Sequence, residues 1–107
     1  PMPFVKLATL AELPPGKPIG RAHGKHQVCL ARVGGELFAI NDVCTHAGAP
    51  LHEGDLGRAG DCILTCPWHE AHFDLRTGKA LPDSDWAFDT DSYAVELRGD
   101  EVWVDLD

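Results

Sequence analysis

Two short cysteine–histidine segments constrain this chain more than any other feature of its sequence. They are Cys44-Thr45-His46 and, after nineteen intervening residues, Cys66-Pro67-Trp68-His69. Each segment places one thiolate and one imidazole on a short loop, close enough for both to bind a metal. Both loops follow a predicted strand, and a rigid sheet is a common support for such a site.

Two kinds of metal centre suit two thiolates and two imidazoles. One is a tetrahedral zinc ion, and the other is a [2Fe–2S] cluster with two histidines on one iron and two cysteines on the other. Structural zinc sites usually take like ligands from one loop. Here each loop mixes one cysteine and one histidine, so each loop can supply one ligand to each iron. The spacing favours the iron–sulfur cluster, and a zinc-stabilised binding module without a redox role is the alternative.

The rest of the chain predicts an all-β fold in a single domain of 107 residues. Apolar residues mostly recur with a period of two, and the 11 glycines and 8 prolines favour turns over long helices. We expect an antiparallel sandwich or barrel with a loop-rich, cluster-binding lobe inserted at about residues 42–81. One helical turn is expected at residues 9–12. The expected strands are 4–7, 19–23, 27–33, 36–40, 62–65, 72–75, 93–98 and 101–106.

The charge is uneven and excludes some classes of partner. The net charge is −8, with +3 on residues 1–41 and −11 on residues 42–107. Such a chain is repelled by nucleic acid and by anionic membranes, whereas an acidic surface can steer a basic protein partner. The run Asp83, Asp85, Asp89 and Asp91 is expected to be a solvated face, with a docking patch as the alternative. The sequence shows no signal peptide and no apolar run of membrane-spanning length, so we expect a cytoplasmic protein.

At the two metal-binding segments the sequence resembles the Rieske family. The likeness continues through Ala49-Pro50-Leu51 and Glu53-Gly54 after the first segment, and through Phe73-Asp74 and Thr77-Gly78-Lys79 after the second. The resemblance implies a Rieske-type [2Fe–2S] cluster. It also implies that Cys44 and Cys66 bind the buried iron, while His46 and His69 bind the iron nearer solvent, where electrons leave.

Four positions indicate which branch of the Rieske family this chain resembles. Respiratory members have two further cysteines, which form a disulfide, where this chain has Ala49 and Trp68. They also have hydroxyl side chains that donate to the cluster and ligand sulfurs where this chain has Ala71 and Phe73. Without those hydrogen bonds we expect a reduction potential toward the low end of the Rieske range, about −150 mV rather than about +300 mV.

The likeness is greatest to the small soluble Rieske ferredoxins. It implies a monomeric one-electron carrier, not an enzyme, which takes electrons from a flavoprotein reductase and docks transiently on a terminal oxygenase. Two alternatives keep the cluster: the Rieske small subunit of an assimilatory nitrite reductase, and the ferredoxin of a di-iron monooxygenase. No glycine-rich phosphate loop follows a strand, which argues against a nucleotide cofactor.

Several residues near the two segments are expected to have roles other than binding the metal. Glu70 stands where the family usually has glycine, so either the turn differs or Glu70 adopts it under strain. His52 and His72 are not expected to bind metal, because the four ligands are already complete. Cys29 and Cys62 lie in apolar patterns and are expected to be buried thiols. The spacer between the segments is slightly long, and residues 56–61 are its expected extension.

Overall fold

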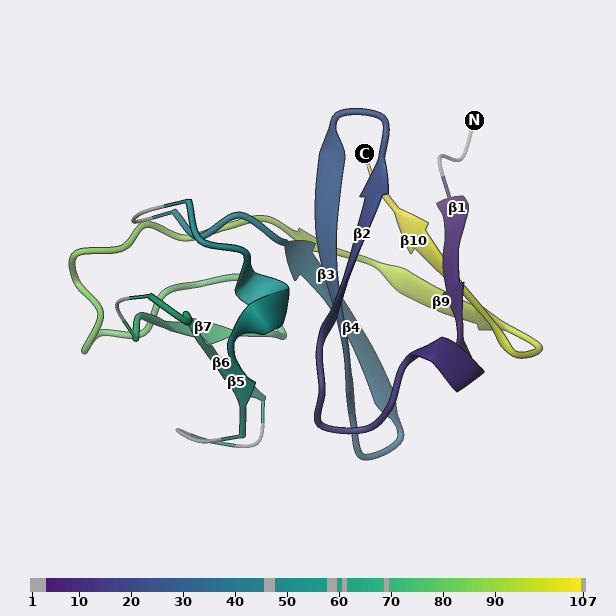
Figure 1. Cartoon of the computed structure of the whole chain (residues 1–107), viewed down its shortest axis with the longest axis horizontal. Coiled ribbons are helices and arrows are strands. Elements are labelled where there is room, and N and C mark those ends of the chain that lie inside the picture. Colours follow the sequence, from purple (N-terminus) through teal and green to yellow (C-terminus); the bar gives the residue numbers. More distant parts are fainter. Residues whose placement is uncertain (1–3, 46–47, 58–59, 61, 69, 107) are drawn as a thin grey trace.

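The computed structural model describes residues 4–45, 48–57, 60, 62–68 and 70–106, and it is almost entirely β-structure (Figure 1). Two short 3-10 turns, η1 (Leu10–Glu12) and η2 (Leu51–Glu53), interrupt the strands. Among these residues no helix is long and apolar enough to cross a membrane. The strands are β1 (Phe4–Thr9), β2 (Ile19–His23), β3 (His26–Val33), β4 (Glu36–Asn41), β5 (Asp55–Leu56), β6 (Ile63–Thr65), β7 (His72–Asp74), β8 (Ser92–Tyr93), β9 (Val95–Arg98) and β10 (Glu101–Asp105).

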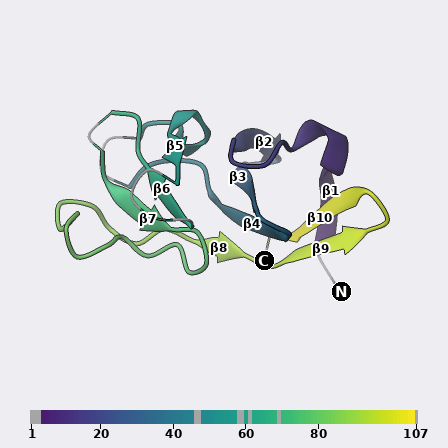
Figure 2. The ribbon, with the colours of Figure 1, turned by 90° about the horizontal axis from the view of Figure 1, so that it is seen from below.

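The strands form three antiparallel sheets, which confirms the predicted fold class. Strands from the two ends of the chain form the sheet β1-β10-β9 and the sheet β2-β3-β4-β8. The middle of the chain forms the third sheet, β5-β6-β7. Figures 1 and 2 show this third sheet on the left, beside the other two, as expected for an insertion into a sandwich or barrel.

Strand β3 is shared between two hydrophobic cores. Val28 and Leu30 belong to one core, which also contains residues of β1, β4 and β10. Cys29 and Ala31 belong to the other core, which contains residues of β6, β7 and both metal-binding segments. Since successive side chains of a strand point to opposite faces, β3 is buried on both sides. We call the first core the barrel core and the second the lobe core.

The structure corrects the expected strand at residues 93–98. The chain changes sheets at Ala94: β8 pairs with β4, whereas β9 pairs with β10. The apolar alternation of the sequence runs through this point because both halves are extended, so the pattern alone gives no break. Strand β5 and turn η2 were also not expected. The helical turn near residue 9 is confirmed as η1, and the Thr9 N–H donates to Glu12 Oε1 at 2.9 Å.

Candidate metal centre

The two metal-binding segments are closed by the same pair of backbone hydrogen bonds. In the first loop the Cys44 N–H donates to the Ala49 carbonyl at 2.8 Å, and the Gly48 N–H donates to the Cys44 carbonyl at 2.9 Å. In the second loop Cys66 makes the same two bonds, at 2.8 and 3.1 Å, with the residues five and four positions after it. The structure therefore presents the two cysteines in equivalent turns, one following β4 and the other following β6.

Both cysteines are buried and outside any disulfide. Cys44 and Cys66 are 2% and 1% exposed and form no disulfide. Both belong to the lobe core, which also contains residues of β3 and β4. Two buried thiols on equivalent turns fit the sulfur ligands of a two-iron cluster. His46 and His69 lie outside the described residues. Within the described part of the chain, no three His, Cys, Asp or Glu side chains gather as a metal site.

Glu70 keeps the turn that the family makes with glycine, in a left-handed conformation. Its φ is 58°, and it is the one non-glycine residue with positive φ among the described residues. The equivalent residue of the first loop is Gly48, with φ of 75°. A side chain in this region costs on the order of 1 kcal/mol or more. Of the two alternatives stated above, the structure supports the strained turn.

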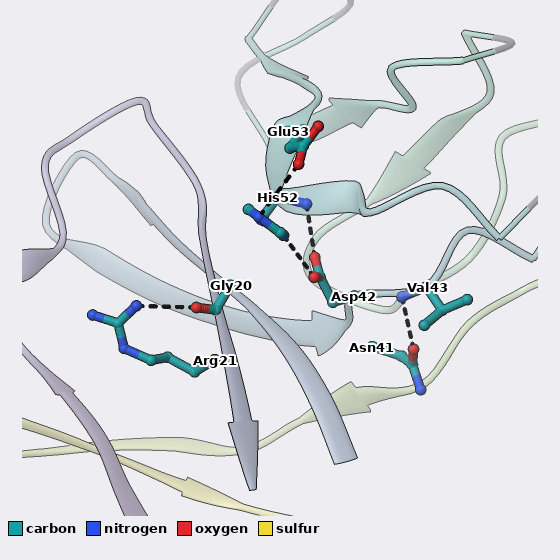
Figure 3. Close-up of polar contacts among 7 residues, drawn as sticks. All are labelled: Gly20, Arg21, Asn41, Asp42, Val43, His52 and Glu53. Carbon is teal, nitrogen blue, oxygen red and sulfur yellow. Dashed lines mark hydrogen bonds and ion pairs between the residues drawn. The ribbon is translucent and has the colours of Figure 1, made fainter. Parts of the chain in front are cut away.

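A buried carboxylate joins the two ends of the first loop (Figure 3). Asp42 is 4% exposed, and its two carboxylate oxygens lie 2.7 Å from the His52 backbone N and 2.6 Å from His52 Nδ1. Its backbone carbonyl accepts from the Leu51 N–H at 2.6 Å. Burial raises the pKa of the Asp42 carboxyl above its usual range, and the hydrogen bonds from His52 partly offset that rise. These contacts fix residues 42 and 52 to each other across the Cys44 loop.

Strand β2 makes room for the His52 ring. A Cβ on Gly20 would lie 2.6 Å from His52 Nδ1, too close for any side chain. Sequence reasoning treated His52 only as a residue that does not bind metal and missed its partner. Because turn η2 was itself not expected, no local pattern pointed to Asp42 as the acceptor for its N–H groups.

Residues 82–91, which we call the acidic segment, are fastened to both loops. The Thr45 hydroxyl accepts from the Phe88 N–H at 2.9 Å and donates to the Phe88 carbonyl at 2.5 Å. Just after the second loop, the His72 N–H donates to Ser84 Oγ at 2.8 Å, and His72 Nδ1 lies 2.9 Å from Asp83 Oδ2. Figure 2 shows this light-green segment passing β7 and leading into β8.

The remaining candidates are accounted for by burial and by hydrogen bonds. Cys29 and Cys62 are buried thiols, as expected, at 0% and 4% exposure, and burial raises the pKa of the Cys29 thiol. The hydrogen bond from His72 lowers the pKa of the Asp83 carboxyl. The acidic run is therefore only partly a plain solvated face, because Asp83 and Asp89 also accept hydrogen bonds from the lobe. Half of the expected spacer extension, residues 58, 59 and 61, lies outside the described residues.

The strain at Glu70 gives a reciprocal test. Glu70→Gly should stabilise the protein by about 1 kcal/mol, because glycine adopts positive φ without steric cost. Gly48→Ala should destabilise it by a similar amount, since the first loop has the same turn and open space around a Cβ. Urea unfolding followed by circular dichroism measures both changes. A Glu70→Gly variant less stable than the unaltered protein would show that contacts of the Glu70 side chain outweigh the strain.

Comparisons with known proteins agree with this geometry. Residues 4–95 match the Rieske [2Fe-2S] domain family. The chain is 38% identical over 99 residues to the 3-phenylpropionate/cinnamic acid dioxygenase ferredoxin subunit of Shigella flexneri serotype 5b, covering 91% of this chain and 88% of that one. It is 37% identical over 108 residues to the biphenyl 2,3-dioxygenase ferredoxin component of Rhodococcus jostii, covering 99% and 95%.

Solved structures of dioxygenase ferredoxins share the fold. The ferredoxin of carbazole 1,9a-dioxygenase from Nocardioides aromaticivorans superposes with a TM-score of 0.84 at 33% identity, covering 95% of this chain and 96% of that one. The ferredoxin–oxygenase complex of carbazole 1,9a-dioxygenase gives the same TM-score at 27% identity, covering 98% and 94%. With its paired cysteine turns and a matched region of most of its length, this chain belongs to the Rieske [2Fe-2S] domain family, and its cofactor is a Rieske-type [2Fe–2S] cluster.

Proposed function

We propose that this chain is the ferredoxin component of a ring-hydroxylating dioxygenase system and carries one electron at a time to a terminal oxygenase. The observation that carries the proposal is the pair of equivalent loops that hold Cys44 and Cys66 in the lobe core. The relatives named as dioxygenase ferredoxins support the choice of partner. We further propose that a flavoprotein reductase is the electron donor. The protein is proposed to be monomeric and cytoplasmic. Four cysteines that form no disulfide suit a reducing compartment.

The proposed ligands are Cys44, His46, Cys66 and His69. When bound, the cluster supplies a one-electron redox couple. The protein contributes two buried thiolates on turns that backbone hydrogen bonds close. It also contributes a stiff support, because the β3–β4 pair behind the loops is packed on both faces. A rigid environment limits the rearrangement that accompanies a change of charge, which suits repeated electron transfer.

The lobe core supports a potential toward the low end of the Rieske range. Ala71 and Phe73 are both fully buried, and neither carries a hydroxyl that could donate to sulfur. A hydrogen bond to a cluster sulfur stabilises the electron-rich reduced state, so its absence lowers the potential.

Restoring a hydroxyl at Phe73 tests whether the missing hydrogen bond to sulfur keeps the reduction potential low. Phe73→Tyr should raise the reduction potential, because the resemblance places a tyrosine hydroxyl at this position near sulfur. Phe38→Tyr adds the same hydroxyl to β4, where Phe38 is only partly buried against the lobe core, and should leave the potential unchanged. Voltammetry of the holoproteins measures both. A midpoint of the unaltered protein well above zero would contradict the low-potential assignment.

Electron delivery tests the proposed partner. The protein, reduced by dithionite, is mixed in a stopped-flow instrument with the oxygenase component of biphenyl 2,3-dioxygenase or of carbazole 1,9a-dioxygenase. With the aromatic substrate and O2 present, we expect reoxidation whose rate follows oxygenase concentration, with one dihydroxylated product formed for every two electrons that the protein delivers. Cys66→Ser should deliver no electrons, since a proposed cluster ligand is lost. The nitrite reductase alternative has the same cluster, so reoxidation by a nitrite reductase catalytic subunit, with none by either oxygenase, would overturn the proposal.

A further inference from the structure

Large apolar side chains are exposed mainly on the metal-binding loops and the acidic segment. Among the described residues, Trp68 is 57% exposed beside the second ligand position, and Val43, which precedes Cys44, is 41% exposed. On the acidic segment Trp86 is 44% and Phe88 75% exposed. The fifth such residue, Leu97, is 49% exposed and lies on β9 in the sheet β1-β10-β9, outside these segments. Exposed apolar side chains on segments that hydrogen bonds join favour an interaction site, whereas a single exposed residue does not.

The Phe88 ring is exposed on a backbone that is held in place. Both its N–H and its carbonyl are hydrogen-bonded to the Thr45 hydroxyl. Thr45 stands between Cys44 and His46, so Phe88 is tied directly to the first ligand loop. At 75% exposure the ring contributes little to the cores. Because the backbone is already held, binding a partner through this ring costs only side-chain freedom, which favours association.

The surroundings of Phe88 are acidic. Residues 80–97 contain no lysine or arginine, whereas Asp83, Asp85 and Asp89 of the acidic segment are all exposed. Asp83 and Asp89 also hold the segment to the lobe through hydrogen bonds, while the structure assigns Asp85 no such bond. A partner surface that fits this face therefore carries basic side chains around an apolar recess.

We propose that the acidic segment is the docking element for the terminal oxygenase. The Phe88 ring enters an apolar recess of the oxygenase, and Asp85 faces lysine or arginine at its rim. Because the Thr45 hydroxyl joins Phe88 to the first ligand loop, the docked ring lies beside the expected point of electron exit. This inference rests on the proposed function and adds the residues that recognise the partner and the chemistry of the surface they recognise.

Matched substitutions separate docking from folding. Phe88→Ser removes the ring and leaves the backbone groups that bond to Thr45, and Leu97→Ser removes a comparable exposed side chain from β9. We expect Phe88→Ser to raise the concentration of oxygenase needed for half-maximal reoxidation by about tenfold or more, as for a hot-spot residue. Its reduction potential and the electron paramagnetic resonance (EPR) spectrum of its reduced form should be unchanged. Leu97→Ser should match the unaltered protein, and Phe88→Tyr should restore binding.

Charge is tested by a second pair of variants. Asp85→Asn should slow association with the oxygenase at low salt and reduce its salt dependence. Asp100→Asn, in the β9–β10 turn, also removes one negative charge, but outside the acidic segment. It should change neither the association rate nor its salt dependence. The oxygenase used is the one that reoxidises the unaltered protein in the assay of the preceding section.

Three results would overturn the inference. In the first, Phe88→Ser binds the oxygenase as well as Leu97→Ser does, which leaves the proposed function standing and removes only the docking element. In the second, Phe88→Ser alters the potential or the EPR spectrum, which makes the residue structural. In the third, the unaltered protein self-associates in sedimentation experiments and Phe88→Ser abolishes that self-association. The face would then be a contact between copies of this chain. If the unaltered protein reduces neither oxygenase, the proposed function itself fails and the inference with it.

Discussion

Burial of β3 on both faces is the constraint on which the rest of the structure depends. The strand contributes Val28 and Leu30 to the barrel core and Cys29 and Ala31 to the lobe core. Full burial of Val28 and of Leu30 is worth about 1.5–3 kcal/mol each, and the smaller Cys29 and Ala31 contribute less. Loss of this strand would therefore weaken both cores. The loops with Cys44 and Cys66 pack against the second face. The cluster site is therefore supported by the same strand that stabilises the barrel.

The loops themselves are held without a disulfide, since Ala49 and Trp68 stand at the positions where respiratory relatives have the extra cysteines. Backbone hydrogen bonds close each turn, and Asp42 joins the ends of the first loop through His52. The acidic segment adds a third layer of support, since it bonds to the first loop at Thr45 and to the start of β7 at His72. The segment that stabilises the loops also carries the exposed ring proposed to meet the oxygenase.

Much of this architecture could be predicted from sequence because alternation along strands is a local property. The expected strands near β2, β3, β4 and β10 agree with the structure to within a residue or two. The break at Ala94 was missed because it depends on which strand is the partner, which alternation does not encode. The Asp42–His52 and Thr45–Phe88 contacts were missed for the same reason. They join residues 10 and 43 positions apart, and no local pattern marks either pair. The pairing of His46 and His69 with the two cysteines remains a prediction.

The central claim, that the two loops hold a [2Fe–2S] cluster through Cys44 and Cys66, is tested most directly by metal and sulfide analysis of anaerobically purified protein. We expect about two iron ions and two acid-labile sulfides per chain, with a Rieske-type EPR signal after reduction. Cys44→Ser and Cys66→Ser should lose the signal, whereas Cys62→Ser, which changes an equally buried thiol of the same core, should keep it. A colourless protein with stoichiometric zinc and no sulfide would show that the two loops hold zinc and not a [2Fe–2S] cluster.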